Sequence, residues 1–286
     1  KEVGSRWRFN SMVSKIFNQK IKSKFLIAEA GINHNGNLKE AFLLVDKAKE
    51  SMADAIKFQT YKAEKRVKKY SPIFNILKKC ELSDEDFFKL KNYCDKKNII
   101  FFSTPFDCES VIFLNKLKVK LFKISSFDVV NSDLINAIKK TKKPTIVSTG
   151  MASLKEIQGT YQKFKNNKIP VALLHCISSY PNLEENSYLS NITDLQKKFD
   201  CPIGLSDHTP NIKTSIYSYI LGANIIEKHF YLGKGHNCVD KGVSLDPKQM
   251  RQLKKELINI DKIFGNVKYG LKKGEEFAKT LRRKKM

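Results

Sequence analysis

From residue 25 onward, short apolar runs alternate with amphipathic segments of helical period. Runs that are apolar on both faces are typical of parallel strands in a sheet that is covered on both sides. Strands that alternate strictly with helices also need helical crossovers, which places the chain in the α/β class. The eight runs occupy residues 25–31, 53–60, 99–105, 121–126, 144–150, 171–178, 202–209 and 223–230.

The segments between the runs carry helix signals. Residues 38–51 and 82–97 are amphipathic, and Ser83 followed by Asp86 has the spacing of a capping box. A last helix is predicted over residues 247–264, where it ends at a glycine. Eight strand–helix units over roughly 240 residues match a closed (β/α)8 barrel, the TIM barrel. The rival fold, a doubly wound open sheet, would place G-x-G-x-x-G after its first strand, and none follows here.

We expect one barrel domain over residues 25–265, followed by a basic linker or tail over residues 266–286. Residues 1–24 form an N-terminal extension. Within it, Met12 is the predicted natural start, and residues 1–11 are then foreign to the natural protein. The alternative for these residues is a targeting segment, because they are rich in arginine and poor in acidic residues.

Composition narrows the class of protein. No apolar run reaches the about eighteen residues of a membrane helix, so no membrane span or membrane partner is expected. The six cysteines form no C-x-x-C pair, which is typical of a reduced compartment, and we expect a cytoplasmic protein. The net charge of +24 indicates either attraction to anionic substrates or a lysine-rich solvated surface. No basic motif is interleaved with aromatic residues, so no nucleic-acid partner is expected.

Every predicted strand becomes polar where it ends. The active sites of (β/α)8 barrels lie at the carboxyl ends of their strands, so these residues are predicted to surround one polar cup. They are Glu29, Lys57, Gln59, Ser103, Thr104, Lys123, Ser125, Ser126, Ser148, Thr149, His175, Ser178, residues 206–208 and residues 227–229.

His208 and His229 end two neighbouring strands. Because adjacent strands lie about 4.8 Å apart, both imidazoles can reach one metal ion and leave its other positions open to water and substrate. Such a site suits Mn²⁺, with Mg²⁺ and Co²⁺ as alternatives, acting as a Lewis acid on a carbonyl group. The competing interpretations are a general acid or base, or two structural histidines in a helix cap and in the rim.

Lys57 and Lys123 lie inside apolar strands, where a cation is costly unless it meets an anion. Two such ammonium groups predict a clamp for phosphate and carboxylate groups. The hydroxyl groups expected to assist are those of Thr104, Ser126, Ser148 and Ser206. The alternatives are a Schiff-base lysine with a lowered pKa, as in class I aldolases, and lysines that point outward between helices.

Three further residues have both a chemical and a structural interpretation. Glu29 could orient a substrate hydroxyl, act as a general acid or base, or form an ion pair with one of the lysines. Asp240 follows the last strand, where it could bind sugar hydroxyls or support its turn. Tyr180 could cover the substrate or pack ahead of Pro181.

Taken together, the strand ends resemble those of the sialic acid synthase family, which includes N-acetylneuraminate synthase and its legionaminate-forming relatives. The resemblance runs from Phe25 to about Gly265. It is carried by AEAGINHNG (28–36), DAIKFQTY (54–61), FFSTPFD (101–107), FKISSFD (122–128), STGMASL (148–154), LLHCISSYP (173–181), GLSDHT (204–209), EKHF (227–230) and the run from Asp240 to Pro247.

The resemblance implies a homodimeric transferase that condenses phosphoenolpyruvate with an N-acetylmannosamine-type amino sugar. The products would be a sialic-acid-like nonulosonic acid and phosphate, released by C–O cleavage. The resemblance assigns His208 and His229 to the metal, and Glu29 to sugar orientation and proton transfer. The residues on the sugar side would be Gln59, Tyr180 and Asp240. The phosphoenolpyruvate-binding set would be Lys57, Thr104, Lys123, Ser126, Ser148 and Ser206.

The sequence departs from the family pattern in three places. Cys238 and Val239 stand where the family has Gly-Pro, which bears on sugar specificity, and Phe127 is expected to narrow the cup. We also expect the barrel to lack the family's C-terminal antifreeze-like domain, which contributes an arginine to the partner's sugar site. Two other functions stay open: a class I Schiff-base aldolase on the same barrel, and a non-catalytic basic binding protein.

Overall fold

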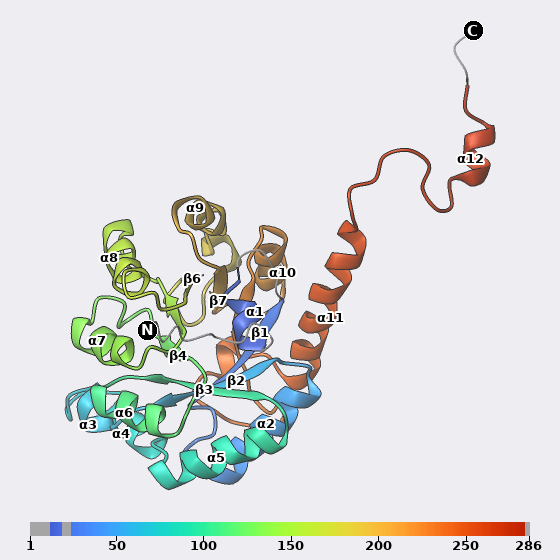
Figure 1. Ribbon diagram of the computed structural model, residues 1–286. Coiled ribbons are helices and arrows are strands. Elements are labelled where there is room, and N and C mark those ends of the chain that lie inside the picture. The colour runs from blue at the N-terminus through green and yellow to red at the C-terminus, as the bar shows by residue number, and fades with distance from the viewer. Residues whose placement is uncertain (1–11, 19–23, 284–286) are drawn as a thin grey trace.

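The computed structural model describes residues 12–18 and 24–283, so the prediction for residues 1–11 lies outside the described residues. Eight parallel strands form a ring with helices on its outside (Figure 1). The strands are β1 (Phe25–Gly31), β2 (Ala55–Thr60), β3 (Ile100–Pro105), β4 (Phe122–Ile124), β5 (Thr145–Ser148), β6 (Val171–Cys176), β7 (Ile203–Asp207) and β8 (Ile225–His229). The predicted (β/α)8 barrel is confirmed, and each strand falls within one predicted run.

The strands pair in the order β3-β2-β1-β8-β7-β6-β5-β4. The strands at the two ends of this ladder, β3 and β4, contact each other and complete the ring. In the register of the sheet, Glu29 of β1 lies beside Lys57 of β2 on one side and His229 of β8 on the other. The carboxyl ends of these strands are therefore level with one another, as a shared active-site rim requires.

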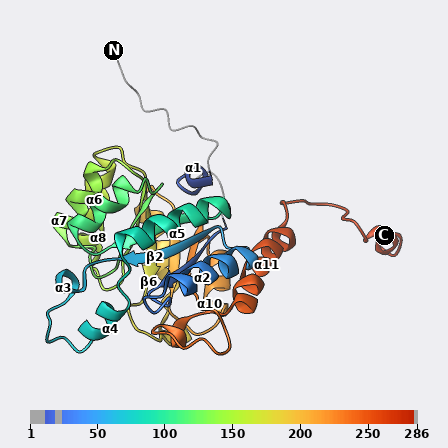
Figure 2. The same cartoon turned by 90° about the horizontal axis from the view of Figure 1, so that it is seen from below.

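Helices cover the outside of the ring (Figure 1, Figure 2). The helices of the described residues are α1 (Met12–Ile16), α2 (Leu38–Glu50), α3 (Ala63–Arg66), α4 (Phe74–Lys79), α5 (Asp84–Lys96), α6 (Cys108–Lys116), α7 (Ser132–Lys140), α8 (Leu154–Lys165), α9 (Ser190–Lys198), α10 (Lys213–Ile220), α11 (Pro247–Phe264) and α12 (Glu276–Thr280), with 3₁₀ turns at Glu184–Asn186 and Lys241–Val243. The predicted capping box is present, because Ser83 and Asp86 exchange hydrogen bonds at the start of α5.

Alternation along the strands separates two apolar cores. Leu26 and Ala28 of β1 belong to the cluster that packs between the ring and the helices. Ile27 belongs, with Phe102 of β3, to a second buried cluster that fills the inside of the ring. Because successive side chains point to opposite faces, Glu29 points inward like Ile27. The same period of two directs the polar ends of the other strands into the cup.

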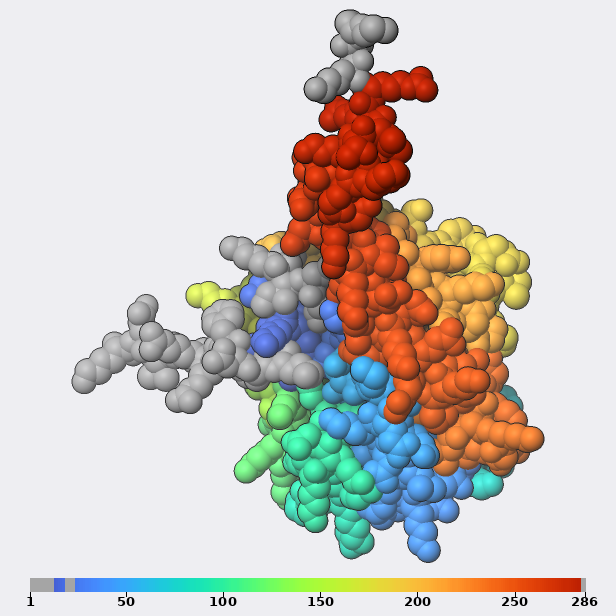
Figure 3. All heavy atoms as spheres, turned by 90° about the vertical axis from the view of Figure 1, so that its right-hand side faces the viewer, coloured from blue at the N-terminus to red at the C-terminus, as the bar shows by residue number. Residues whose placement is uncertain are grey.

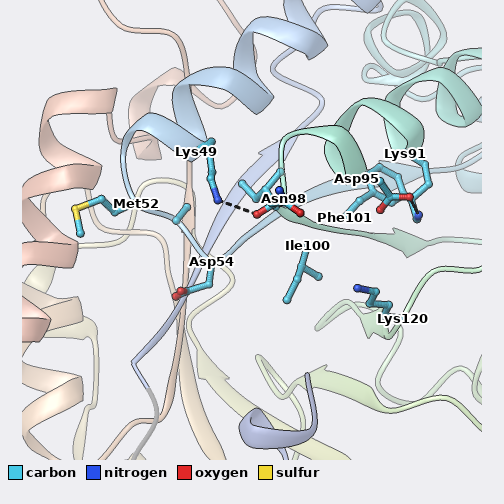
Figure 4. A pocket seen from close by; sticks show the side chains of 11 residues that line it. Lys49, Met52, Asp54, Lys91, Asp95, Asn98, Ile100, Phe101 and Lys120 are labelled. Carbon is cyan, nitrogen blue, oxygen red and sulfur yellow. Dashed lines mark hydrogen bonds and ion pairs between the residues drawn. The ribbon is translucent and has the colours of Figure 1, made fainter. Parts of the chain in front are cut away.

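The N-terminal end of the barrel is covered by α1, whose Val13 and Ile16 join the inner apolar cluster. A pocket of about 1000 Å³ lies beside α1. A second pocket, of about 450 Å³, lies at the start of β2 and β3, where Lys49 donates a hydrogen bond of 2.8 Å to the carbonyl of Asn98 (Figure 4). Both pockets lie at the opposite end of the strands from the predicted cup.

After α11 the chain leaves the barrel, and α12 lies apart from it (Figure 1, Figure 3). The predicted division into an extension, a barrel over residues 25–265 and a basic tail stays a prediction. Across the part of the chain that the structure describes, no helix combines the length and the apolar character of a membrane span.

Candidate active site

Four charged side chains lie buried at the carboxyl ends of the strands. Glu29 of β1, Lys57 of β2, Lys123 of β4 and Glu227 of β8 are 2%, 3%, 3% and 4% exposed. Lysine and glutamate side chains are almost never fully buried unless they are paired. Two cations and two carboxylates balance here, so the floor of the cup is built from ion pairs.

Lys57 contacts three groups at once. Its Nζ lies 2.8 Å from Oε2 of Glu29 and 3.7 Å from Oε1 of Glu227. It also donates a hydrogen bond of 3.0 Å to Oγ1 of Thr104. Burial alone would lower the pKa of Lys57, but the carboxylates of Glu227 and Glu29 outweigh burial and raise it. Lys57 is therefore a charged ammonium group inside the ring, and the outward-facing alternative is wrong.

Lys123 also points inward, but it has fewer charged partners. Its Nζ donates a hydrogen bond of 2.6 Å to Oγ of Ser148 and lies 3.5 Å from Oε1 of Glu227. Burial lowers the pKa of Lys123, because the attraction of Glu227 offsets burial only in part and Lys57 adds repulsion. The two lysines thus share one carboxylate and differ in how firmly they hold their protons.

The sequence predicts that Glu227 lies at the polar rim, but it did not lead us to assign this residue a catalytic or binding role. Burial would raise the pKa of this carboxyl, but Lys123 and Lys57 lower it to about 2. Its Oε1 also accepts a hydrogen bond of 3.0 Å from Oγ of Ser206. The alternation of side chains along a strand could have indicated such a role. Glu227 stands two residues before His229 on β8, so both side chains face the same side of the strand.

Glu29 and Glu227 hold their protons differently although both are buried. Burial raises the pKa of Glu29, and repulsion by Glu227 adds to that effect while Lys57 opposes it. Glu227, held between two ammonium groups, stays ionised. Two neighbouring carboxyl groups with separated pKa values can divide the roles of proton donor and permanent anion. Glu29 is the candidate proton donor of this pair.

His208 and His229 come together as predicted, with ring centroids 5.5 Å apart. Nδ1 of His208 lies 2.6 Å from the carbonyl oxygen of Ile177. Nδ1 of His229 lies 3.2 Å from Oδ2 of Asp240. With its proton on Nδ1, opposite these oxygen atoms, each ring would present Nε2 as an electron-pair donor. Histidines that bind metals are commonly oriented by carbonyl or carboxylate groups in this way.

The donor set fits a divalent ion with open coordination positions. Burial and the neighbouring His229 lower the pKa of His208 to about 4, so its imidazole is neutral near pH 7. Within the described ranges, no three His, Cys, Asp or Glu side chains are placed to hold one ion. The two imidazoles would therefore act as a pair, and water and substrate oxygens would complete the coordination. The ring of Tyr180 covers them, 4.1 Å from His208 and 5.8 Å from His229 between centroids.

Glu29, Gln59 and Asp240 converge at one patch beside the histidines. Nε2 of Gln59 donates a hydrogen bond of 3.4 Å to Oε1 of Glu29. A Cβ atom added at Gly31 would lie 3.3 Å from Glu29 Oε1 and 3.4 Å from both Gln59 Nε2 and Asp240 Oδ2. The absence of a side chain at Gly31 thus lets three polar groups approach one another. This patch is the candidate sugar side of the cup.

Ser126 is the exception in the predicted anion-binding set. Its Oγ lies 2.8 Å from Oγ of Ser178, and its role in anion binding stays a prediction. The other three hydroxyl groups each contact a charged side chain of the floor; they belong to Thr104, Ser148 and Ser206. Phe127 is 61% exposed, and the expected narrowing of the cup by its ring stays a prediction.

The chain is similar to the proteins of one family. The family model described as the NeuB family matches residues 44–269. N,N'-diacetyllegionaminic acid synthase from Legionella pneumophila is 37% identical over 85% of this chain and 73% of its own length. N-acetylneuraminate-9-phosphate synthase from Homo sapiens is 30% identical over 85% of this chain and 71% of its own length. The crystal structure of N-acetylneuraminic acid (sialic acid) synthetase from Leptospira borgpetersenii in complex with citrate has a TM-score of 0.85 and 39% identity, and covers 92% of this chain and 93% of that chain.

Proposed function

The chain belongs to the NeuB family, and we propose that its cup condenses phosphoenolpyruvate with an amino-sugar aldehyde to give a nonulosonic acid and phosphate. The similar proteins that are named as legionaminic and sialic acid synthases support this class of enzyme. The observation that carries the proposal is the inward-facing pair of lysines. Lys57 and Lys123 approach one oxygen of Glu227, at 3.7 Å and 3.5 Å, from separate strands.

Phosphoenolpyruvate is a compact anion with a carboxylate and a phosphate group, and two separated ammonium groups can hold one group each. Hydroxyl groups beside the lysines add neutral donors, with Thr104 next to Lys57 and Ser148 next to Lys123. Glu227 attracts both lysines and holds them close together in the free enzyme. Anion binding here would cost little reorganisation, because the donors are already in place.

The reaction joins C3 of phosphoenolpyruvate to the aldehyde carbon of the sugar. The aldehyde oxygen takes a proton, and water adds to the cationic C2 that results. The new C2 hydroxyl becomes the ketone as the C–O bond to phosphate breaks, and the leaving phosphate takes the hydroxyl proton. Glu29, with its raised pKa, would give the first proton and then take one from the attacking water, which returns it to its starting state. Gln59 and Asp240 lie beside it and would hold sugar hydroxyl groups.

A divalent metal fits at Nε2 of His208 and His229, and Mn²⁺, Mg²⁺ and Co²⁺ all suit such ligands. When bound, it would supply Lewis-acid polarisation of the aldehyde. Asp240 would hold the His229 ring in the ligating tautomer, and Tyr180 would exclude water from one side of the two rings.

A phosphate-release assay tests the proposal. The enzyme is stripped with EDTA, supplied with Mn²⁺, and given phosphoenolpyruvate with a panel of N-acetylated mannosamine derivatives. We expect phosphate release that needs the sugar, vanishes after stripping and returns with Mn²⁺. The variant Glu29→Gln should lower kcat by about a hundredfold or more, because it removes the proton donor. Full activity in the stripped enzyme would overturn the metal assignment, and release without sugar would overturn the condensation.

A further inference from the structure

Arg66, the last residue of α3, lies beside the cup and has no role in the reaction described above. Its Nη1 donates a hydrogen bond of 2.8 Å to Oε1 of Gln59. The amide of Gln59 in turn donates to Glu29 at 3.4 Å. Arg66 is therefore joined, through one side chain, to the candidate proton donor on the sugar side.

Two aromatic rings hold the guanidinium group of Arg66 in place. Its Cζ lies 3.7 Å from the ring centroid of Phe106 and 4.8 Å from that of Tyr61. The two rings meet edge to face at 6.2 Å, and the hydroxyl of Tyr61 donates to the carbonyl of Leu77 at 2.9 Å. A guanidinium stacked on aromatic faces keeps its N–H groups directed outward in one plane. Arg66 is thus fixed before any substrate arrives.

This arginine has more hydrogen-bond donors than its surroundings use. A guanidinium carries five N–H donors in a rigid fork. Gln59 is the one hydrogen-bond acceptor that the described side chains offer to Arg66. Arginine is retained at partly buried sites mainly where its fork meets oxygen acceptors. The remaining donors indicate an acceptor that comes from the substrate.

The charges around Arg66 favour an uncharged acceptor oxygen. Burial lowers the pKa of Arg66, whereas Tyr61 and the acidic residues Asp128, Asp240 and Glu29 oppose that effect. Asp240 lies at the same patch as Gln59, the hydrogen-bond partner of Arg66. A phosphate group brought there would meet repulsion from the carboxylate of Asp240, whereas a carbonyl or hydroxyl oxygen would not. The N-acyl carbonyl and the hydroxyl groups of an amino sugar are oxygens of this kind.

We propose that Arg66 is a sugar-binding residue that donates hydrogen bonds to uncharged oxygens of the amino sugar and so selects it over a sugar phosphate. The inference rests on the proposed function, because it names the substrate class of that same site. Arg66 would hold the part of the sugar away from the aldehyde, while Glu29 and the histidines face the reacting carbon.

Steady-state phosphate release tests this with N-acetylmannosamine, an N,N'-diacetylated counterpart and N-acetylmannosamine 6-phosphate, each varied at saturating phosphoenolpyruvate. We expect the wild-type kcat/KM to be at least about tenfold higher for the better unphosphorylated sugar than for the phosphate. Arg66→Leu should raise the KM for that sugar by about 10- to 100-fold, the loss expected for hydrogen bonds from a charged donor. The KM for phosphoenolpyruvate should change less than threefold, by roughly the effect of a distant charge.

Two further variants separate direct contact from indirect effects. Lys65→Leu removes a neighbouring positive charge that pairs with Glu109 on the surface, and it should leave both KM values unchanged. In a Gln59→Leu background, Arg66→Leu should still raise the KM of the sugar, because the proposed contact does not pass through Gln59. Thermal unfolding of Arg66→Leu checks that the barrel is intact.

Each other outcome has a distinct meaning. An active enzyme whose sugar KM is unaffected by Arg66→Leu would overturn the inference and leave the proposed function standing. Loss of the effect in the Gln59→Leu background would make Arg66 a positioning residue and overturn direct contact. A wild-type preference for the phosphorylated sugar would overturn the uncharged class. A wild-type enzyme that releases no phosphate with any sugar would remove the proposed function, and this inference with it.

Discussion

The ammonium groups of Lys57 and Lys123 reach the same oxygen atom, Oε1 of Glu227, although their strands are not neighbours in the ring. Each lysine has a second partner of its own, Glu29 for Lys57 and Ser148 for Lys123. A carboxylate between two ammonium groups attracts both of them and holds them near each other. The free enzyme thus holds two ammonium groups around one carboxylate oxygen, where a dianionic substrate could meet both.

Removing either lysine should weaken phosphoenolpyruvate binding. Lys57→Met and Lys123→Met should each raise its KM by about 10- to 100-fold, since charge-assisted hydrogen bonds contribute roughly 1.5 to 3 kcal/mol. Their effects on stability should differ, because Lys57→Met leaves Glu29 without its partner at 2.8 Å. We expect a loss of about 3 kcal/mol for Lys57→Met in urea unfolding, and a smaller loss for Lys123→Met.

Two controls separate charge balance from substrate binding. Adding Glu29→Gln to Lys57→Met should recover stability, because the carboxylate that lost its partner is also removed, but it should not recover activity. Lys228→Met breaks a buried ion pair with Asp207 at 3.1 Å on the outer face of β8. It should lower stability while the KM for phosphoenolpyruvate stays at the wild-type value. An unchanged KM in both Lys57→Met and Lys123→Met would contradict the anion clamp.

The alternation of side chains along each strand made the inward-facing residues of the site predictable from the sequence. The period of two along each strand places Lys57, Lys123 and His229 inside the ring, and the strand ends define the rim. Whether two inward residues touch depends on the register and shear of strands that are distant in the sequence. That is why the contact of Glu227 with both lysines was not foreseen.

Contacts made by residues in the loops after the strands could not be predicted from the sequence either. The position of Arg66 depends on how the segment between β2 and α3 folds back onto Phe106 after β3. Ser126, Gly150 and Ser178, which follow three different strands, also approach one another closely. Such contacts join residues that have no periodic relation in the sequence, so no sequence pattern predicts them.

Asp240 should control metal affinity through His229. Asp240→Asn keeps the shape of the side chain but removes the charge that faces Nδ1 at 3.2 Å. Loss of such an orienting carboxylate typically weakens metal binding by about 10- to 100-fold. We therefore expect a higher Mn²⁺ concentration for half-maximal activity, with activity returning at excess metal. Free Mn²⁺ measured by electron paramagnetic resonance should show the same shift without any turnover.

A matched pair elsewhere in the chain provides the control for this prediction. Nε2 of His236 faces Oε2 of Glu40 at 3.3 Å, away from the two proposed metal ligands. Glu40→Gln should leave the Mn²⁺ titration unchanged, while His229→Gln should abolish binding at every concentration tested. An Asp240→Asn enzyme that binds Mn²⁺ like the wild type would show that the carboxylate has no part in the metal site.

Trapping with borohydride separates the synthase from a Schiff-base aldolase. Lys123 is the better candidate for an aldolase lysine, because burial lowers its pKa. Its Nζ is engaged with Ser148 at 2.6 Å and with Glu227 at 3.5 Å, so we expect no attack on a carbonyl carbon. Incubation with pyruvate and borohydride should therefore leave the intact mass unchanged. A covalent adduct that maps to Lys123 or Lys57 would favour the aldolase instead.

His34, in the loop after β1, should make the protein less stable in mild acid. Its side chain is buried, Nδ1 accepts a hydrogen bond of 3.1 Å from the backbone N–H of Gly36, and Nε2 has no hydrogen-bond partner among the described residues. Burial lowers the pKa of His34 to about 4 from its ordinary 6.5. The unfolded chain therefore takes up a proton at this residue before the folded protein does.

Protonation of His34 favours the unfolded chain over the folded protein. The contribution of His34 to stability is complete above about pH 6.5 and is lost as the pH falls towards 4, by about 2 kcal/mol between pH 7 and pH 5. His34→Asn keeps an acceptor for the Gly36 N–H but cannot titrate, so its unfolding free energy should fall less over this interval. Urea unfolding of both proteins at pH 7 and pH 5 measures the difference, and His208 titrates in both and cancels. Equal losses in the two proteins would show that His34 takes up its proton as easily in the folded state as in the unfolded chain.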